Sequence, residues 1–462
     1  MKKKGRSILR IYNTLTRRKE ELKTITDGEV KIYACGPTVY NYIHIGNSRP
    51  LCVFDTLRRY LEYRGYKVNF VQNFTDIDDK IIKKAIEENS DYKTVSEKYI
   101  KEFWTDAKGL NFREATVHPK ATENIDEIIN IISTLVEKGY AYPVENGDVY
   151  FSPKKFSGYG KLSHQPLEEL EAGARINIGE LKREPMDFAL WKGAKPGEPY
   201  WESPWGKGRP GWHIECSAIS MKHLGEYLDL HCGGVDNIFP HHTNEIAQSE
   251  AAVGHPWCSH WFHVQHLNDR EGKMSKSKGN ILTVSVLQEK GYDPLVYRMF
   301  CLQSHYRKPL EFSYDTLDNS KAAYERLLNR IAGIPQEGET NAAQFEDYRR
   351  RFIEKVGNDL NTSLGLTVLY DLLKDSDVNG ATKRAIIADF DRVLSLNLLS
   401  GGTNTAEEHS DEFVRYVEGL IRERAEAKKN KNYARADEIR AELAEKGVTL
   451  KDSKEGTSWT KA

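Results

Sequence analysis

The stretch VKIYACGPTVYNYIHIGN at residues 30–47 decides the fold of this chain of 462 residues. An alternating, β-rich run breaks at Gly36-Pro37 and passes through His44, Ile45 and Gly46 into a helical pattern, VFDTLRRYLEYRGY, at 53–66. A second β-rich run, KVNFVQN at 67–73, follows and ends before another helical segment. Strand, loop, helix and strand predict a βαβ unit in a parallel sheet, with a ligand site beyond the carboxyl ends of the strands.

Outward from this unit, the patterns change along the chain. Residues 120–210 show Gly, Pro and aromatic turns around short strands, which indicates an insertion. Strand signals fade after Ser277, and heptad-like apolar spacing at 322–331, 352–373 and 382–399 predicts a helical bundle. The expected fold class is therefore α/β, a doubly wound parallel sheet with an insertion domain, followed by an α-helical bundle and a small C-terminal domain. The expected segments are 1–120, 121–210, 211–270, 271–330, 331–400 and 401–462.

Composition excludes several classes of protein. Hydrophobic residues make up 39% and charged residues 29%, so a packed core is expected and a disordered chain is not. The 67 Lys and Arg balance 68 Asp and Glu, so any nucleic-acid contact must depend on local charge. No secretory signal or membrane-spanning run is found, which favours a cytoplasmic protein without membrane contact. The six cysteines are scattered and are expected to be reduced, buried or bound to metal.

Two short segments have the composition of phosphate-binding loops. Residues 273–280, KMSKSKGN, place three lysines within six residues among hydroxyls, ending with glycine. Such a loop can surround a polyphosphate, and alone it can equally be an exposed basic turn. His44-Ile45-Gly46-Asn47 lies at a strand-to-helix turn, where free N–H groups and the helix dipole attract an anion. A histidine there can also be a simple helix cap.

A third group has metal-ligand chemistry. His241 and Glu245 are four residues apart, so on a helix they would share one face, whereas His242 would point about 100° away. Cys35 ends the first strand and Cys216 lies in GWHIECS at 211–217. Two thiolates, an imidazole and a carboxylate make a plausible zinc shell. From spacing alone, buried apolar cysteines beside an ordinary His–Glu pair explain these residues as well.

Together, the two loops resemble the HIGH and KMSKS signatures of class I aminoacyl-tRNA synthetases. The second signature is complete at 273–277, and the first has Asn47 in place of its last histidine. Asparagine still donates a hydrogen bond but has no positive charge.

More widely, the chain resembles the cysteinyl-tRNA synthetase family. The matching stretches are CGPTVY at 35–40, NFTDIDDK at 73–80, GWHIECSA at 211–218, FPHH at 239–242, NEIAQ at 244–248, KMSKS at 273–277 and ADEIR at 436–440. The resemblance implies zinc ligands at Cys35, Cys216, His241 and Glu245. It divides the chain into catalytic halves at 1–120 and 211–270, a connective insertion, a KMSKS and stem-contact region, a tRNA-binding bundle and an anticodon-binding region.

That family's reaction is implied as well. L-Cysteine would react with ATP, accompanied by Mg²⁺, to give cysteinyl-adenylate, and the cysteinyl group would pass to the terminal adenosine of tRNA(Cys). Catalysis would depend on electrostatic stabilisation of the phosphate rather than on an enzyme nucleophile. The expected catalytic and ATP-binding residues are His44, Gly46, Asn47, Lys273 and Lys276, and the expected substrate contacts are Cys35, Thr75, Trp212, His231 and Asp236. One zinc per chain would select the thiolate, and a monomer is expected.

Two alternatives remain open at this point. A ligase with the same catalytic half could pass activated cysteine to the amine of an amino sugar, although such an acceptor needs no extension beyond the Gly401-Gly402 linker. The second alternative is an inactive RNA-binding or regulatory paralogue. The intact 273–277 motif and the four ligand residues argue against it.

Overall fold

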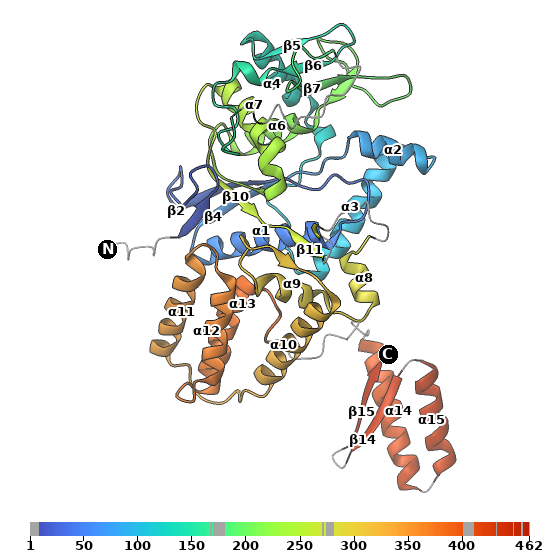
Figure 1. Cartoon of the computed structure of the whole chain (residues 1–462). Coiled ribbons are helices and arrows are strands. Elements are labelled where there is room, and N and C mark those ends of the chain that lie inside the picture. The colour runs from blue at the N-terminus through green and yellow to red at the C-terminus, as the bar shows by residue number, and fades with distance from the viewer. Residues whose placement is uncertain are drawn as a thin grey trace. The chain divides into compact units, whose positions relative to one another are not determined.

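The structure, a computed structural model, describes residues 9–166, 169, 181–269, 272–273, 281–400, 411–430, 432–446, 448–453 and 456–461. The chain forms two compact units, Met1–Leu399 and Ser400–Ala462 (Figure 1). Among the described helices, none combines the length and apolar character needed to cross a membrane.

A four-stranded parallel sheet forms the centre of the first unit. Its order is β10 (Cys258–Val264), β9 (Leu228–Gly234), β3 (Glu29–Ala34) and β4 (Lys67–Gln72). The chain leaves β3 through α1 (Ile45–Tyr63) to β4 on one side, whereas β9 joins β3 on the other side. The strand order therefore reverses between β3 and β9, and ligands of doubly wound sheets bind beyond the carboxyl ends of strands at such a reversal.

Helices cover both faces of this sheet. Ile32 and Ala34 of β3 share one apolar core with α1, whereas Tyr33, between them, shares another with α6 (Trp212–Leu224). Successive residues of a strand point to opposite faces, which explains this alternation. The α/β, doubly wound fold expected from the sequence is confirmed.

A second sheet lies within the insertion, which Figure 1 shows together with α4 and α7. It is antiparallel, in the order β5 (Ala141–Pro143), β6 (Val149–Phe151), β7 (Phe188–Gly193) and β8 (Gly208–Pro210). Its core includes Ile128 and Ile132 of α4 (Ile125–Glu137) and Ile214 of α6. The insertion thus packs onto the helix that contains Cys216. The remaining catalytic-half elements are β1 (Arg10–Asn13), β2 (Arg18–Glu21), α2 (Asp79–Glu87), α3 (Tyr92–Gly109) and α7 (Thr243–Val253).

Helices dominate the rest of the first unit, but not entirely as the sequence predicts. The helices are α8 (Val284–Glu289), α9 (Pro294–Leu302), α10 (Tyr314–Ala332), α11 (Ala342–Gly357), α12 (Thr362–Lys374) and α13 (Gly380–Leu394). The expected apolar segment at 352–373 is two helices, because Asp359 and Leu360 have positive φ angles of 71° and 46° and turn the chain. Strands also continue beyond Ser277, since β13 (Leu310–Glu311) joins β11 (Leu267–Asp269) and β12 (Gly272–Lys273).

The second unit has its own small core. Helices α14 (Asp411–Lys429) and α15 (Tyr433–Glu445) pack with the hairpin of β14 (Val448–Ser453) and β15 (Gly456–Lys461). Val417, Ile439, Leu443 and Val448 are its buried apolar residues, together with others of the same cluster. The linker expected at 401–404 lies outside the described residues.

Candidate active site and metal centre

A cavity of about 430 Å³ opens where the strand order reverses. The loop after β3, the first turns of α1 and the ends of β9 and β10 with the chain beyond them form most of its lining, and α2, α3 and α6 contribute Lys80, Tyr99 and Trp212. Of the residues expected to bind substrates, Cys35, Gly46, Asn47, Trp212 and Asp236 line this cavity. The sheet topology therefore brings together residues from distant parts of the sequence.

At one end of the cavity, α1 presents its N-terminus. His44 is the N-cap, and its Nδ1 accepts a hydrogen bond of 3.0 Å from the main-chain N–H of Gly46. The helix begins at Ile45, eight residues before the pattern predicted from Val53, because this cap starts it earlier. Gly46 and Asn47 thus belong to the first turn, where the helix dipole favours an anion, while their N–H groups already donate to His44.

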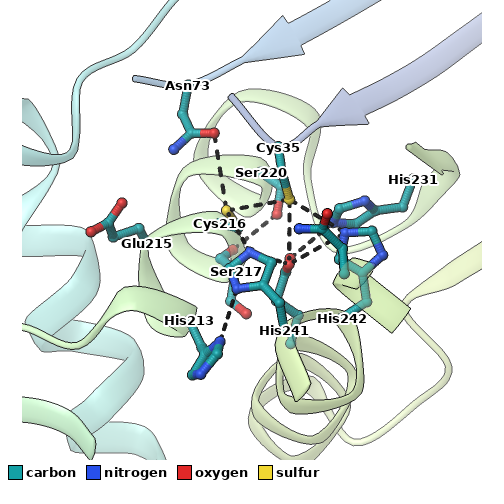
Figure 2. Close-up of polar contacts among 12 residues, drawn as sticks. Cys35, Asn73, His213, Glu215, Cys216, Ser217, Ser220, His231, His241 and His242 are labelled. Atoms are coloured by element: carbon teal, nitrogen blue, oxygen red, sulfur yellow. Dashed lines mark hydrogen bonds and ion pairs between the residues drawn. The ribbon is translucent and has the colours of Figure 1, made fainter. Parts of the chain in front are cut away.

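At the other end, four potential metal ligands converge. The ligand atoms of Cys35, Cys216, His241 and Glu245 lie within 4.8 Å of one another. Figure 2 shows how Cys35, Cys216 and His241 lie close together. The Sγ atoms of Cys35 and Cys216 are 3.8 Å apart, and His241 Nε2 lies 3.6 Å from Cys216 Sγ. Glu245 Oε1 lies 3.0 Å from His241 Nε2 and 3.6 Å from Cys35 Sγ.

Two glycines allow this convergence. A Cβ on Gly36 would lie 1.5 Å from the main-chain oxygen of Asn73, and the Gly36 N–H donates to Asn73 Oδ1 at 2.9 Å. A Cβ on Gly233 would lie 2.5 Å from the His242 ring. The end of β3 can therefore approach the end of β4 because residue 36 has no side chain. In the same way, the end of β9 can approach His242 because residue 233 has none.

His241 and Glu245 do not share one helix as expected. Helix α7 begins at Thr243, and residues 238–242 form an irregular turn in which Phe239 is extended. This turn brings His242 toward the ligands as well, with its Nε2 3.4 Å from Cys35 Sγ. His242 itself has helical dihedrals, φ −68° and ψ −30°, and only Phe239 of this segment departs from them. A second possible ligand set results: Cys35, His231, His242 and Glu245.

The metal-free cluster has strongly perturbed protonation. Burial alone would lower the pKa of His241, but the Glu245 carboxylate and Cys216 raise it to about 10. Burial alone would raise the pKa of Glu245, but His231 and His241 lower it to about 2. A hydrogen bond from Cys35 is the main cause that lowers the pKa of Cys216 to about 6. A divalent cation would displace the protons of His241 and of the Cys35 thiol, whose pKa burial raises, so metal binding here would release protons.

Other histidines support the cluster from outside. His213 Nδ1 lies 2.8 Å from His241 Nδ1, and His242 Nδ1 lies 2.8 Å from His263 Nε2. His231, buried on β9, places its Nε2 2.9 Å from Glu245 Oε2. Such outer contacts fix ring orientation in metal sites. His231 thus contacts a potential ligand, whereas the sequence predicted a contact to substrate.

The remaining predicted residues take different positions. Trp212 stacks on His241 with ring centres 4.4 Å apart and is 44% exposed at the cavity. Thr75 is buried and donates its hydroxyl to Glu215 Oε2 at 2.7 Å. The backbone of Lys273 lies in β12, and nothing is described of its side chain. Lys276 and the rest of residues 274–280 lie outside the described residues.

Sequence reasoning missed three residues that the structure places here. Glu215 is buried beside Cys216 and contacts Thr75, and burial with the neighbouring Cys216 raises its pKa. Lys80 lines the cavity, with its ammonium 5.5 Å from the Tyr40 ring centre. Arg49 is completely buried behind the first turn of α1. Glu215 directly precedes Cys216 in the sequence, and this position could have indicated that it belongs to the site. The position of Arg49 is visible only in the tertiary structure.

Comparison with known proteins agrees with this geometry. The family model described as tRNA synthetases class I (C) catalytic domain matches residues 21–322, and the cysteinyl-tRNA ligase anticodon binding domain matches residues 410–459. Methionyl-tRNA synthetase of Mycobacterium tuberculosis, solved with methionyl-adenylate, is similar in fold at 15% identity and a TM-score of 0.55, with 80% of this chain and 88% of that chain covered.

A second solved structure has the same fold. It is the ternary complex of LeuRS from Agrobacterium radiobacter K84, at 10% identity and a TM-score of 0.55, with 81% of this chain and 84% of that chain covered. Fold and catalytic-domain match define a class I aminoacyl-tRNA synthetase. With the second match, the chain belongs to the cysteinyl-tRNA synthetase family, whose members are cysteine–tRNA ligases. An anticodon-binding domain is not expected in an amino-sugar ligase.

Proposed function

We propose that this ligase binds one zinc ion at Cys35, Cys216, His241 and Glu245 and selects its amino acid through the sulfur atom. The observation that supports this most is the convergence of the four ligand atoms within 4.8 Å beside the cavity. Two thiols, an imidazole and a carboxylate suit zinc, and their metal-free contacts with one another are the kind that a cation replaces. The second set has one thiol fewer and suits zinc less well.

Bound zinc would supply a soft Lewis acid that takes a thiolate far more readily than the hydroxyl of serine. Synthetases need discrimination of roughly 10⁴ to 10⁵, which the sizes of these two side chains do not provide. The chain's own residues would orient the rest of the substrate. Thr75 contacts Glu215, the neighbour of Cys216 in sequence, and Trp212 stacks on His241. Trp212 and Asp236 line the cavity.

ATP would occupy the end of the cavity formed by α1. The N-terminus of this helix attracts the phosphates, and Gly46 allows their close approach. His44 uses Nδ1 as the helix cap that starts this helix. Lys273 and Lys276 would stabilise the charge from the KMSKS segment, with Mg²⁺ accompanying ATP. The amino-acid carboxylate then attacks the α-phosphate, so no enzyme nucleophile is needed.

Pyrophosphate exchange with cysteine and with serine, run beside metal analysis, tests this function. We expect about one zinc per chain and exchange with cysteine alone. Removal of the metal by a chelator should abolish the exchange, and added Zn²⁺ should restore it. Normal selectivity in metal-free protein would contradict the proposal, since the side-chain thiol would then be recognised in another way.

For the second half-reaction, we propose that tRNA(Cys) contacts the bundle and that its anticodon binds the second unit. The candidate contacts are Arg422, Arg424, Lys428, Lys429, Lys431 and Arg435, of which Lys431 lies outside the described residues. Of these, Arg424 is only 4% exposed and Arg435 pairs with Glu423 and Glu438, so the others are the stronger candidates. The second unit has its own core, so removing residues from about 405 onward should spare cysteine-dependent exchange and weaken tRNA charging. Equal loss of both activities in a folded truncation would contradict this division.

A further inference from the structure

Arg49 is one of the largest completely buried side chains of the chain, with 0% exposure. Within the described residues, all its hydrogen bonds go to main-chain carbonyl oxygens. Nη1 donates to Gln265 at 2.7 Å and to His266 at 2.5 Å, and Nη2 donates to Lys308 at 2.6 Å and more weakly to His305 at 3.5 Å. Burying a guanidinium on neutral carbonyls is costly, so the contact needs an explanation beyond stability.

The carbonyls belong to two chain segments that meet behind the cavity. Residues 264–267 connect β10 to β11 and line the cavity, and residues 305–308 lead to β13. These segments also bond to each other, since the Gln265 N–H donates to Tyr306 O at 2.9 Å. Arg49 lies in the second turn of α1, close after Gly46 and Asn47. Its guanidinium therefore links α1, whose N-cap is His44, to the 264–267 segment that lines the same cavity.

A second contact joins α1 to the chain beyond the KMSKS segment. The Ile45 N–H donates to Leu282 O at 2.9 Å, and the Tyr297 hydroxyl donates to Ile45 O at 2.6 Å. The start of α1 is thus bonded to residues on both sides of 274–280: Gln265 and His266 before it, and Leu282 after it. β11, which follows His266 directly, pairs with the strand that contains Lys273.

We propose that Arg49 is a positioning residue for ATP, which holds the 264–267 wall of the cavity at a fixed distance from the α1 N-terminus. The inference rests on the proposed binding of ATP at this end. Arginine is required because its planar fork donates to two segments at once, whereas the single ammonium of lysine has no such geometry. Arg49 touches neither substrate directly; it acts through the carbonyls of Gln265 and His266.

The test compares Arg49→Lys with a matched control, Arg298→Lys. Arg298 is also 0% exposed and also donates to carbonyls of two segments, Leu394 O at 2.8 Å and Leu110 O at 3.0 Å, and unlike Arg49 it also pairs with a carboxylate, Asp55, at 2.7 Å. Its partners lie outside the cavity lining, whereas Gln265 and His266, which Arg49 holds, belong to that lining. The measurements are the KM values for ATP and cysteine in pyrophosphate exchange, equilibrium ATP binding, and the thermal midpoint of each variant.

We expect Arg49→Lys to raise the KM for ATP about tenfold, the equivalent of one or two lost hydrogen bonds, while the KM for cysteine stays near wild type. Arg298→Lys should lower the thermal midpoint and leave both KM values unchanged. An equal rise of the KM values for ATP and cysteine in Arg49→Lys would overturn the assignment. The same rise of the KM for ATP in Arg298→Lys would also overturn it. Absence of ATP binding by the wild-type chain would instead contradict the proposed function.

Discussion

The two ends of the cavity are built in different ways. The proposed metal end is formed by side chains. Cys216, His241 and Glu245 are nearly or completely buried and change one another's pKa. At the proposed nucleotide end, main chain dominates, namely the first turn of α1 and the carbonyls of Gln265 and His266 that Arg49 holds. A site of side chains depends on each residue's identity, whereas a site of main chain depends on the path of the backbone.

The largest effect is expected at the metal end, from Cys216→Ala. Loss of one thiolate should remove zinc and reduce cysteine-dependent exchange by about 10³-fold or more, because the selectivity depends on the ion. Zinc content and exchange rate check this. Cys232→Ala is the control, since Cys232 is equally buried on β9 but lies outside both possible ligand sets. Loss of zinc from the control as well would mean that general damage, not ligand removal, explains the result.

A pair of neighbouring variants separates the two ligand sets. His241→Ala should lose zinc, whereas His242→Ala should retain it with weaker affinity, about 10- to 100-fold, as expected for an outer contact. Metal titration of both proteins gives the answer. The reverse order would assign zinc to Cys35, His231, His242 and Glu245 and would move the substrate sulfur accordingly.

At the nucleotide end, His44→Asn separates capping from catalysis. Asparagine is a good N-cap, so α1 should start normally and the thermal midpoint should change little. Loss of the imidazole should still lower kcat of exchange about 100-fold, if the ring stabilises the phosphate charge. Full activity in this variant would show that His44 is only a cap.

A smaller effect is expected where the cysteine backbone would bind. Thr75→Val removes the hydroxyl that donates to Glu215 and should raise the KM for cysteine about tenfold, with the KM for ATP unchanged. Thr75→Ser retains the hydroxyl and should behave nearly as wild type. If both variants raise the KM for ATP as much as the KM for cysteine, Thr75 affects the binding of both substrates and not of the amino acid alone.

The smallest effect on activity is expected from a change at Asp55, which lies in the packed core outside the cavity lining. Burial alone would raise the pKa of Asp55, but Arg298 and Arg59, at 2.7 Å and 2.8 Å, lower it below the ordinary 3.8. The ionised carboxylate therefore stabilises the fold fully above about pH 4, and this contribution disappears as the pH falls further.

Asp55→Asn should cost about 3–5 kcal/mol of unfolding free energy at pH 7, because two buried guanidinium groups lose their partner. Its stability should also depend less on pH below 4, which unfolding curves at several pH values measure. Exchange at pH 7 and moderate temperature should be retained. An acid dependence identical to that of wild type would exclude Asp55 as its source.

Much of the fold was predictable because local patterns agree with it. The break at Gly36-Pro37 and the second β-rich run predicted the parallel unit that β3, α1 and β4 form. The start of α1 was placed too late, since the His44 cap outweighs the poor helical pattern before Val53. The division between α11 and α12 was missed because apolar spacing continues through two residues with positive φ.

The site was only partly predictable, for a physical reason. Cys35, Cys216, His241 and Glu245 were chosen from chemistry and resemblance, and the structure brings all four together. The proximity of His242 to Cys35 was not inferred, because one regular α-helix was assumed through a segment in which Phe239 is extended and α7 begins only at Thr243. Arg49 carries no sequence signal, since its partners are main-chain oxygens more than 200 residues away in sequence.

The indole of Trp212 lies flat against His241 and is partly open to solvent. Tryptophan emission is quenched by a protonated imidazole in contact with it, and the proposed zinc would displace the proton from His241, whose pKa Glu245 and Cys216 raise. On this proposal the site contains its own optical reporter: fluorescence should rise as zinc binds, and Trp212→Phe should remove that signal while the other seven tryptophans continue to emit.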